Sequence, residues 1–543
     1  MSWNYGDILD RLGERVPEDR PCLIHGERTI SWGEFTRRSN NLARNFLADG
    51  AAIGDKVAFY MRNSHAYSEA LGGCFKARLT HVNVNYRYVD DELWYILDNS
   101  DAKIVIYDRE FASHVLALKD RLPEVARWIE VGDLSRPATA EVPFAEDYET
   151  IAASGDGAPL GIERSGDDLL FLYTGGTTGM PKGVMWPHEG NWQAMGAGAL
   201  QSPDMTPPES VDQHIDNCLA IDDYRITVPC CPLMHGTGLF NAIGTLSAGG
   251  CIVTLSHPSF DPVELFETVA RHRANTLAIV GDAFAKPMLK ELDENPGKYD
   301  VSALHTIRSS GVMWSPEVKE GLIRHNEGLT LADSFGASEG VGFGSSVTTA
   351  EGSDKVARFQ IGPNCKVFTE DFREVQPGSD EPGFVAQSGP IPMGYYKDEE
   401  KTAKTFPVVD GVRYSMPGDY CKVAEDGTLI LMGRGSVCIN TAGEKVYPEE
   451  VEEVLKTYPG IVDALVVGVP DDKWGQMVTA VVQPEGESAL DEDAIRVHAR
   501  EHLAGYKTPK RILVKADLQR ASNGKADYKA ITSYAKETLG IDP

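Results

Sequence analysis

Residues 169–184, LLFLYTGGTTGMPKGV, form the segment that decides the fold and the chemistry of this chain. The apolar run LLFLY predicts a buried β-strand, and it leads directly into a loop rich in glycine and threonine. Glycines let backbone N–H groups approach an anion closely, and threonine hydroxyls can donate to phosphate oxygens. Lys182 adds a positive charge. The segment therefore predicts a phosphate-binding loop.

This loop differs from a Walker A loop, in which a Gly-Lys pair is followed by serine or threonine. Here Lys182 lies three residues after Gly179 and precedes Gly183. The sequence thus indicates a phosphate-binding loop of another kind.

The 543 residues of the chain allow roughly three or four structural units at about 100–200 residues per domain.

The net charge of the chain limits the kinds of partner that it can bind. Lys+Arg is 52 and Asp+Glu is 81, which gives a net charge of −29. Nonspecific binding of nucleic acid or of an anionic membrane needs a positive surface, so both are disfavoured.

The compartment is expected to be the cytoplasm. No apolar run reaches the ~18 residues of a transmembrane helix. The first twenty residues are acidic and predict an amphipathic helix rather than a signal peptide. The nine cysteines are scattered without a CxxC motif, which indicates free thiols in a reducing environment.

Strand-like and helix-like segments alternate along the chain, which predicts an α/β fold. Strands are expected at 103–107, 277–280 and 464–469, and a helix at 262–272. The part after about residue 433 is expected to be a separate small α/β unit, with a helix that begins at Pro448.

A serine hydrolase is one alternative interpretation. Gly336–Gly340 satisfies the G-x-S-x-G pattern with Ser338 as nucleophile. The segment 235–238, HGTG, loosely resembles an oxyanion motif, and His498 or His502 could complete a triad. The strand before the serine is short and polar in its middle, and this hypothesis leaves the glycine–threonine loop unexplained.

Taken together, the motifs resemble the adenylate-forming superfamily, in particular AMP-forming acyl-CoA synthetases, over nearly the whole chain. Besides the loop, the similar segments are 334–339 (SFGASE), 414–419 (YSMPGD), 433–448 with Gly433-Arg434 and Pro448, and 520–525 (RASNGK). The segment 433–452, GRGSVCINTAGEKVYPEEVE, is similar to the corresponding segment of an actinobacterial branch of this family. That branch activates long-chain and steroid side-chain acids. Terpenoid acids of natural-product pathways are a related class.

The resemblance implies a large N-terminal adenylation domain over 1–433, a hinge at 434–436 centred on Ser436, and a mobile C-terminal domain over 437–543. It implies that the enzyme is an acid–thiol ligase using ATP, Mg²⁺ and CoA. The expected reaction forms an acyl-adenylate, releases pyrophosphate and transfers the acyl group to CoA.

The resemblance also implies residue roles. Lys525, Ser338, Glu339 and His235 are expected to be catalytic, with Glu339 holding Mg²⁺. The residues expected to bind ATP or AMP are Thr174, Gly175, Gly176, Thr177, Thr178, Gly179, Lys182, Gly311, Val312, Asp333, Ser334, Phe335, Gly336, Asp419 and Arg434. The acyl pocket is expected at Gly238, Gly281, Ala283, Met313 and Ala337, and the CoA channel at Ala442, Gly443 and Lys445.

Two points remain open at the level of sequence. Ala442 stands where the family usually has glycine, so thioester formation is expected to be slower than adenylation, or the acceptor is a carrier protein instead of CoA. A basic stretch, Lys507, Lys510, Arg511 and Lys515, is a candidate for meeting the CoA phosphates. The acyl substrate itself and the oligomeric state, with a homodimer as one option, are not determined.

Overall fold

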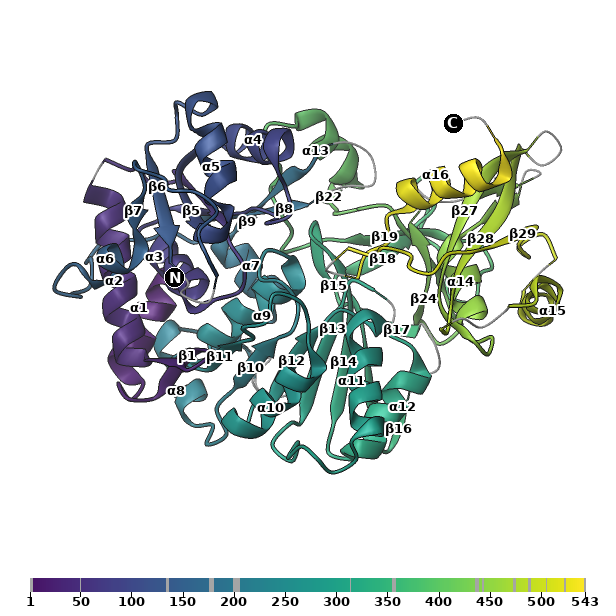
Figure 1. Ribbon diagram of the computed structural model, residues 1–543, viewed down its shortest axis with the longest axis horizontal. Coiled ribbons are helices and arrows are strands. Elements are labelled where there is room, and N and C mark those ends of the chain that lie inside the picture. Colours follow the sequence, from purple (N-terminus) through teal and green to yellow (C-terminus); the bar gives the residue numbers. More distant parts are fainter. Residues whose placement is uncertain are drawn as a thin grey trace. The chain divides into compact units, whose positions relative to one another are not determined.

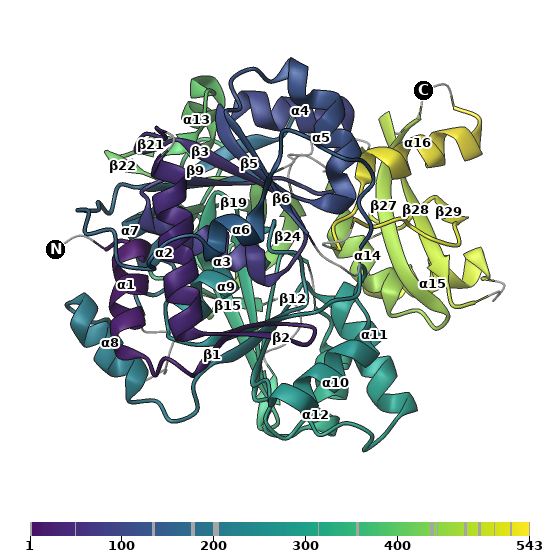
Figure 2. The same ribbon diagram turned by 60° about the vertical axis from the view of Figure 1, so that its left-hand side comes forward.

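The computed structural model describes residues 3–48, 50–132, 136–174, 180–198, 206–312, 314–353, 358–434, 439–441, 444–471, 475–486, 490–503, 505–521 and 524–541. The chain forms two compact units. The first contains Met1–Gly176, Met180–Val356 and Ser388–Ser415, and the second contains Thr177–Gly179, Ala357–Gln387 and Met416–Pro543. Figures 1 and 2 show the elements of each unit.

An eight-stranded sheet forms one part of the first unit. Its strands run in the order β20 (Gly394–Tyr395), β9 (Lys182–Pro187), β8 (Leu169–Thr174), β4 (Thr80–Asn83), β3 (Lys56–Tyr60), β5 (Ala102–Asp108), β6 (Arg127–Val131) and β7 (Glu146–Asp147). The central strands are parallel and buried on both faces, which explains their continuous apolar sequences.

A second sheet of this unit is parallel in its middle. Its strands run in the order β15 (Gly340–Thr349), β14 (Thr330–Ala337), β13 (Thr306–Ser310), β12 (Thr276–Ile279), β10 (Ile226–Pro229), β11 (Cys251–Thr254), β1 (Pro21–His25) and β2 (Arg28–Ser31). β15 also pairs with the short β16 (Gly352–Ser353).

Helices cover both sheets and lie between them. The helices of the unit are α1 (Tyr5–Arg15), α2 (Trp32–Ala48), α3 (His65–Lys76), α4 (Asp90–Asn99), α5 (Ala112–Leu118), α6 (Tyr148–Ala153), α7 (His188–Ala194), α8 (Val211–Leu219), α9 (Gly236–Leu246), α10 (Pro262–His272), α11 (Asp282–Glu294), α12 (Pro316–His325) and α13 (Glu399–Thr405). A core shared by α4 and α5 covers one face of the eight-stranded sheet. A core with α2, α3 and α9 covers its other face. Helices α10, α11 and α12 pack on the second sheet and lie together in Figure 1.

Local sequence explains where these helices begin. The Asn4 side chain accepts a hydrogen bond from the Gly6 N–H at the start of α1. Asp261 does the same for the Val263 N–H at the start of α10, with Pro262 as its first residue. The predicted helix at 262–272 is therefore confirmed, as is the amphipathic helix near the N-terminus.

The second unit contains two sheets. One has the order β18 (Cys365–Phe368), β19 (Gly383–Gln387), β23 (Asp419–Val423), β24 (Leu429–Arg434) and β17 (Arg358–Ile361). The other is built from β26 (Glu444–Val446), β25 (Ile439–Thr441), β28 (Gly475–Pro484) and β27 (Ile461–Asp471), with β29 (Arg511–Val514) beside β28. Helices α14 (Pro448–Lys456) and α15 (Glu492–His502) pack on one face of the latter sheet and α16 (Tyr528–Leu539) on the other.

The predicted elements agree with this fold. The strands expected at 103–107, 277–280 and 464–469 lie within or overlap β5, β12 and β27. Pro448 begins α14, as its sequence context predicts. Among the described residues, no helix is long and apolar enough to cross a membrane.

The end of β5 yields a test of the buried electrostatics. Burial raises the pKa of Asp108 to about 7, although its carboxylate accepts a hydrogen bond from the Arg62 N–H at 2.7 Å. The folded state therefore retains this proton, while the unfolded state loses it near pH 4. The contribution of Asp108 to the free energy of unfolding consequently falls as the pH rises from about 4 to about 7.

We predict that Asp108→Asn removes this loss, because the neutral amide can still accept from the Arg62 N–H. The wild type should lose about 2–3 kcal/mol of unfolding free energy between pH 5 and pH 8 through Asp108, and the variant should not show this loss. Urea unfolding at both pH values measures the difference. The exposed Asp120→Asn is the control and should follow the wild type. If the free energy of unfolding of Asp108→Asn depended on pH as that of the wild type does, the raised pKa of Asp108 would be contradicted.

Candidate functional site

Strands β8 and β9 present the predicted phosphate loop. They are antiparallel, with Thr174 opposite Lys182 at the base of the loop. Gly175, Gly176, Thr177, Thr178 and Gly179 lie outside the described residues. The Lys182 ammonium forms an ion pair with Asp398 at the start of α13, and this hydrogen bond lowers the pKa of Asp398. Lys182 therefore carries a carboxylate partner at the mouth of the loop.

The tight turn between β14 and β15 carries Ser338 and Glu339. Glu339 is 9% exposed, and its Oε1 accepts a hydrogen bond from the Tyr395 hydroxyl at 2.6 Å. The Ser415 hydroxyl donates to the Glu339 carbonyl oxygen at 2.5 Å. These two bonds fix both the backbone and the carboxylate of Glu339.

The phosphate-loop hairpin holds this turn in place. Trp186 of β9 donates from Nε1 to the Ser338 carbonyl oxygen at 2.9 Å. Tyr395, the partner of Glu339, belongs to β20, which pairs with β9 through Tyr395↔Val184. The structure thus brings together two motifs that the sequence separates by about 160 residues.

The segment expected to contact adenine lies at the ends of two neighbouring parallel strands. Gly311 and Val312 follow β13, and Ser334, Phe335 and Gly336 belong to β14. Gly311 has φ of 93°, and a Cβ there would lie 3.8 Å from Val280 and 3.9 Å from Thr237. Met313 lies outside the described residues.

Asp333 points away from this edge and into the core. Its carboxylate lies 3.4 Å from the Lys319 ammonium of α12. Burial raises the pKa of Asp333 to about 6, against the attraction of Lys319. The Asp333 carboxylate is therefore engaged with Lys319, so only the backbone of Asp333 would be expected to contact a nucleotide.

The residues expected around the acyl group take up different positions. His235 is the N-cap residue of α9, and Gly238 lies in the first turn of that helix. A Cβ at Gly238 would collide with the Pro232 carbonyl oxygen, so glycine serves the packing of α9 on the preceding loop. Gly281 has φ of 50° just before α11, Ala283 is exposed on α11, and Ala337 ends β14.

The second unit carries the predicted ribose-binding pair. Asp419 begins β23 and Arg434 ends β24, and the two residues are directly opposite each other in the antiparallel register. Gly433 has φ of 108°, and a Cβ there would collide with the Glu449 carboxylate. Both properties require glycine beside Arg434.

Hydrogen bonds hold the described residues of the C-terminal motif 520–525, which are 520, 521, 524 and 525. Arg520 forms two hydrogen bonds with the Asp463 carboxylate of β27, at 2.5 and 2.9 Å. The Ala521 N–H donates to the Lys525 carbonyl oxygen at 2.9 Å, and the Lys525 side chain is exposed. Burial alone would raise the pKa of Asp463, but Arg520 holds it below its ordinary value.

Other predicted residues of this unit are only partly described. Ser436, Ala442 and Gly443 lie outside the described residues, and for Lys445 only the backbone, in β26, is described. In the basic stretch, Lys507 forms an ion pair with Glu450 at 2.5 Å, and Lys515 donates to the Asp517 carbonyl oxygen.

Four residues of the site were missed at the level of sequence: Trp186, Tyr395, Asp398 and Ser415. Asp398 had a detectable signal, because Asp-Glu-Glu before a helical segment is typical of an N-cap. Tyr395 had no local signal, since its role depends on the pairing of β20 with β9.

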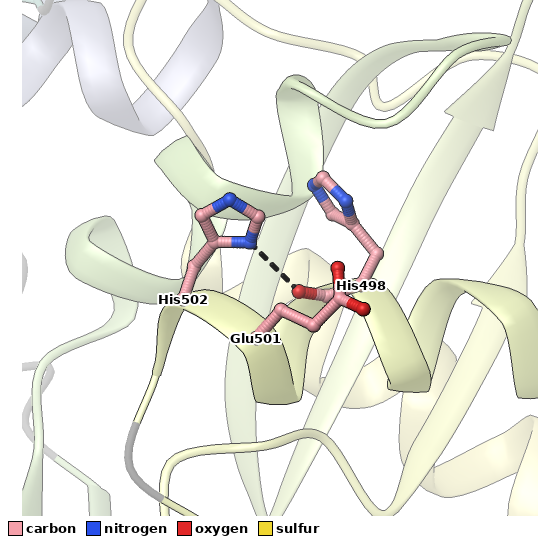
Figure 3. A group of neighbouring side chains, drawn as sticks. All are labelled: His498, Glu501 and His502. Atoms are coloured by element: carbon pink, nitrogen blue, oxygen red, sulfur yellow. Dashed lines mark hydrogen bonds between the residues drawn. The ribbon is translucent and has the colours of Figure 1, made fainter.

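The serine-hydrolase alternative is wrong. A nucleophile elbow needs a strand, a turn and then a helix, whereas Ser338 lies between two antiparallel strands. Both candidate histidines lie on α15 of the second unit and have local partners. His498 bonds to the Thr457 hydroxyl at 2.8 Å, and His502 Nδ1 donates to the His498 carbonyl oxygen at 2.9 Å (Figure 3).

The same two histidines and Glu501 are neighbours on α15 (Figure 3). Their ligand atoms lie within 4.8 Å of one another, so they could hold a metal ion at the surface. In the first unit, the Tyr395 hydroxyl donates to one carboxylate oxygen of Glu339, the residue expected to hold Mg²⁺.

Comparison with known proteins identifies the family. Residues 9–396 match the AMP-binding enzyme family, and residues 450–525 match the AMP-binding enzyme C-terminal domain. The chain is 38% identical over 556 residues to the 3-oxocholest-4-en-26-oate–CoA ligase of Rhodococcus rhodochrous, covering 100% of this chain and 97% of the relative. It is also 38% identical over 547 residues to a medium/long-chain-fatty-acid–CoA/3-oxocholest-4-en-26-oate–CoA ligase of Mycobacterium tuberculosis, covering 100% and 97%.

Solved structures show the same fold. The anthranilate CoA ligase AuaEII, in complex with anthranoyl-AMP, superimposes with a TM-score of 0.84 at 19% identity, covering 99% of this chain and 98% of that one. ATP-bound MatB from Rhodopseudomonas palustris gives a TM-score of 0.81 at 23% identity, covering 99% and 100%.

The family matches and the two-unit α/β fold define an adenylate-forming enzyme. The chain belongs to the AMP-binding enzyme family. The expected class, an AMP-forming acid–CoA ligase that works through an acyl-adenylate and uses ATP and CoA, is confirmed by the family and by the relatives.

The bond between Tyr395 and Glu339 gives a direct test of the site. We predict that Tyr395→Phe lowers kcat for adenylate formation about 10- to 100-fold, because a hydrogen bond to a charged group contributes about 1.5–3 kcal/mol. The Mg²⁺ concentration required for half-maximal rate should rise. Pyrophosphate release at varied Mg²⁺ measures both effects.

The neighbouring tyrosine supplies the matched control. Tyr396 also donates to a carboxylate, that of Asp101 at 2.7 Å, away from Glu339. Tyr396→Phe should leave kcat and the Mg²⁺ requirement within about twofold of the wild type, because the hydrogen bond that it removes is to Asp101 and not to Glu339, while the ring stays in place. Equal losses in both variants would contradict the role assigned to Tyr395.

Proposed function

We propose that the protein activates a bulky hydrophobic carboxylic acid, namely a fatty, steroid side-chain or terpenoid acid, and transfers it to CoA. The observation that supports this proposal is the 38% identity, over the whole chain, to relatives named as ligases of 3-oxocholest-4-en-26-oate and of medium- and long-chain fatty acids. The cytoplasm is the proposed compartment, and a homodimer remains one option for the assembly.

The first half-reaction joins two anions. The substrate carboxylate attacks the α-phosphorus of ATP, and pyrophosphate leaves. Positioning and charge neutralisation therefore supply most of the catalysis. We assign the pyrophosphate to the N–H groups and hydroxyls of the loop 174–179 and to Lys182, and the α-phosphate to the Ser338 hydroxyl.

Glu339 is the proposed ligand of Mg²⁺. Its carboxylate is nearly buried and is oriented through Oε1 by Tyr395, which suits a fixed ligand beside phosphates. When bound, Mg²⁺ neutralises charge on the phosphates. Ser415 and Trp186 hold the backbone of the turn and so keep Ser338 and Glu339 in register with each other.

The second unit supplies the remaining groups. Asp419 and Arg434, opposite each other on β23 and β24, are proposed to bind the ribose hydroxyls. Lys525 is proposed to bind between the substrate carboxylate and the α-phosphate. The Arg520–Asp463 pair supports this role because it anchors the loop that carries Lys525.

In the second half-reaction the CoA thiol attacks the acyl-adenylate carbonyl and AMP leaves. We propose that residues 437–543 move about the hinge 434–436, at Ser436, between the two halves. The stretch Ala442, Gly443 and Lys445 then lines the pantetheine channel, and His235 gates the acyl pocket. The alternative acceptor is a carrier protein, which Ala442 in the channel would favour.

A screen of pyrophosphate release across fatty, steroid side-chain, terpenoid and aryl acids tests the proposed substrate class. We expect the highest kcat/KM with a bulky aliphatic or steroid acid. A second assay adds CoA to the same acids and measures acyl-CoA formation, which distinguishes CoA from a carrier protein as the acceptor. Formation of the adenylate without acyl-CoA would favour a carrier protein. Preference for aryl acids would contradict the proposal.

Lys525 gives the sharpest test of the division between half-reactions. We predict that Lys525→Ala abolishes adenylate formation yet largely spares acyl-CoA formation from a supplied acyl-adenylate, because its ammonium neutralises charge only in the first step. Lys529→Ala, an exposed lysine in α16, is the control and should retain both activities. Equal loss of both half-reactions in Lys525→Ala would rule out this role.

A further inference from the structure

Arg308 in β13 is an arginine that the reaction described above does not use. Its Nε is shielded from solvent and has no hydrogen-bond partner. In the described part of the chain it forms no ion pair, and burial lowers the pKa of its guanidinium. Arg308 as a whole is half-buried, so the unpaired group is this one N–H. A shielded N–H without an acceptor is costly, so it points to a ligand that supplies one.

The register of the sheet shows which way Arg308 points. Thr227, Thr276 and Thr306 are aligned across β10, β12 and β13, so their side chains share one face of the sheet. The Thr227 hydroxyl bonds to the Thr245 hydroxyl of α9 at 2.8 Å. This face is therefore the one that α9 covers.

Arg308 lies two residues after Thr306 and so projects from the same face. Its neighbours in register are Ala278 on β12 and Ala332 on β14, so small side chains flank it on both strands. The residue that precedes it, Ile307, belongs to the core under α10, α11 and α12 on the opposite face. Arg308 thus extends toward α9, above two alanines.

This face leads to the predicted acyl pocket. Ser310 follows Arg308 by two residues, about 7 Å along the strand, on the same face. It precedes Gly311, which lies next to Thr237 at the start of α9, beside His235. Arg308 therefore lies deeper than the reacting end of the pocket, between the sheet and α9.

A second arginine approaches the same region. A Cβ at Gly244 of α9 would lie 3.9 Å from the Arg225 Nη1 and 3.4 Å from the Met195 Cε. Burial, followed by the charge of Arg308, lowers the pKa of Arg225 to about 9. The guanidinium groups of Arg225 and Arg308 therefore lie close enough to repel each other on the α9 side of the sheet.

We propose that the acyl pocket accepts an acid with a second carboxylate, which Arg308 binds at the end remote from the nucleotide. A carboxylate fits because it offers two oxygens and a negative charge to a guanidinium. A neutral ketone offers one acceptor oxygen and no charge. The substrate class is then a dicarboxylic acid, and this inference rests on the proposed function.

The test compares monocarboxylic acids with the α,ω-dicarboxylic acids of equal chain length and with their monomethyl esters, by pyrophosphate release. The wild type should show a higher kcat/KM for at least one diacid than for its monoacid and its monoester. Arg308→Met should lower that value about 10- to 100-fold through KM, the range for a hydrogen bond to a charged group. The ratio of kcat/KM for the diacid to kcat/KM for its monoacid should fall by a similar factor.

Arg271→Met, an exposed arginine on α10 paired with Glu27, is the control and should retain the diacid preference. If Arg308→Met does not fold, the wild-type comparison of diacid and monoester still decides. A monoester or keto acid turned over as well as the diacid would overturn the inference and leave the proposed function intact. No pyrophosphate release with any acid would instead contradict the proposed function.

Discussion

The bond from the Tyr395 hydroxyl to Glu339 is the constraint on which the arrangement of the first unit's site depends. It joins the β14–β15 turn to β20, and β20 pairs with β9 of the phosphate-loop hairpin. The bond from Trp186 to the Ser338 carbonyl oxygen adds a second connection between the same two elements. Because all of these groups are buried or nearly so, their geometry is fixed before substrates arrive, which is the condition for efficient electrostatic catalysis.

Much of this organisation was readable from the sequence. The apolar run before Thr174 and the glycine–threonine pattern predicted a strand and its loop, and β8 confirms the strand. Asp419 and Arg434 were assigned by resemblance, and the register of β23 and β24 places them opposite each other. The strand could be predicted because it depended on a short segment with its own periodicity, whereas the nucleotide roles of the loop and of Asp419 and Arg434 stay predictions.

The parts that escaped prediction depend on pairing between distant segments. Tyr395 acquires its role only because β20 adds to the edge of the sheet beside β9. Gly238 looked like free space for a substrate, but its missing Cβ accommodates the Pro232 carbonyl oxygen. Ser338 satisfied a hydrolase pattern whose structural context, a helix after the turn, is absent from this hairpin. A local pattern does not specify what packs against it.

The charge of the chain shows how an acidic protein can use polyanionic substrates. The net charge of −29 cannot attract ATP or CoA by long-range forces. Cations of the predicted motifs are instead held by carboxylates within each unit: Lys182 by Asp398 in the first, and Arg520 by Asp463 in the second. Such pairs orient a cation without creating a strong field, so an anion binds only where it can displace or share the carboxylate partner. Selectivity therefore comes from geometry at short range, and Arg308, which lacks such a carboxylate among the described residues, is the position where an anionic ligand competes with no internal partner.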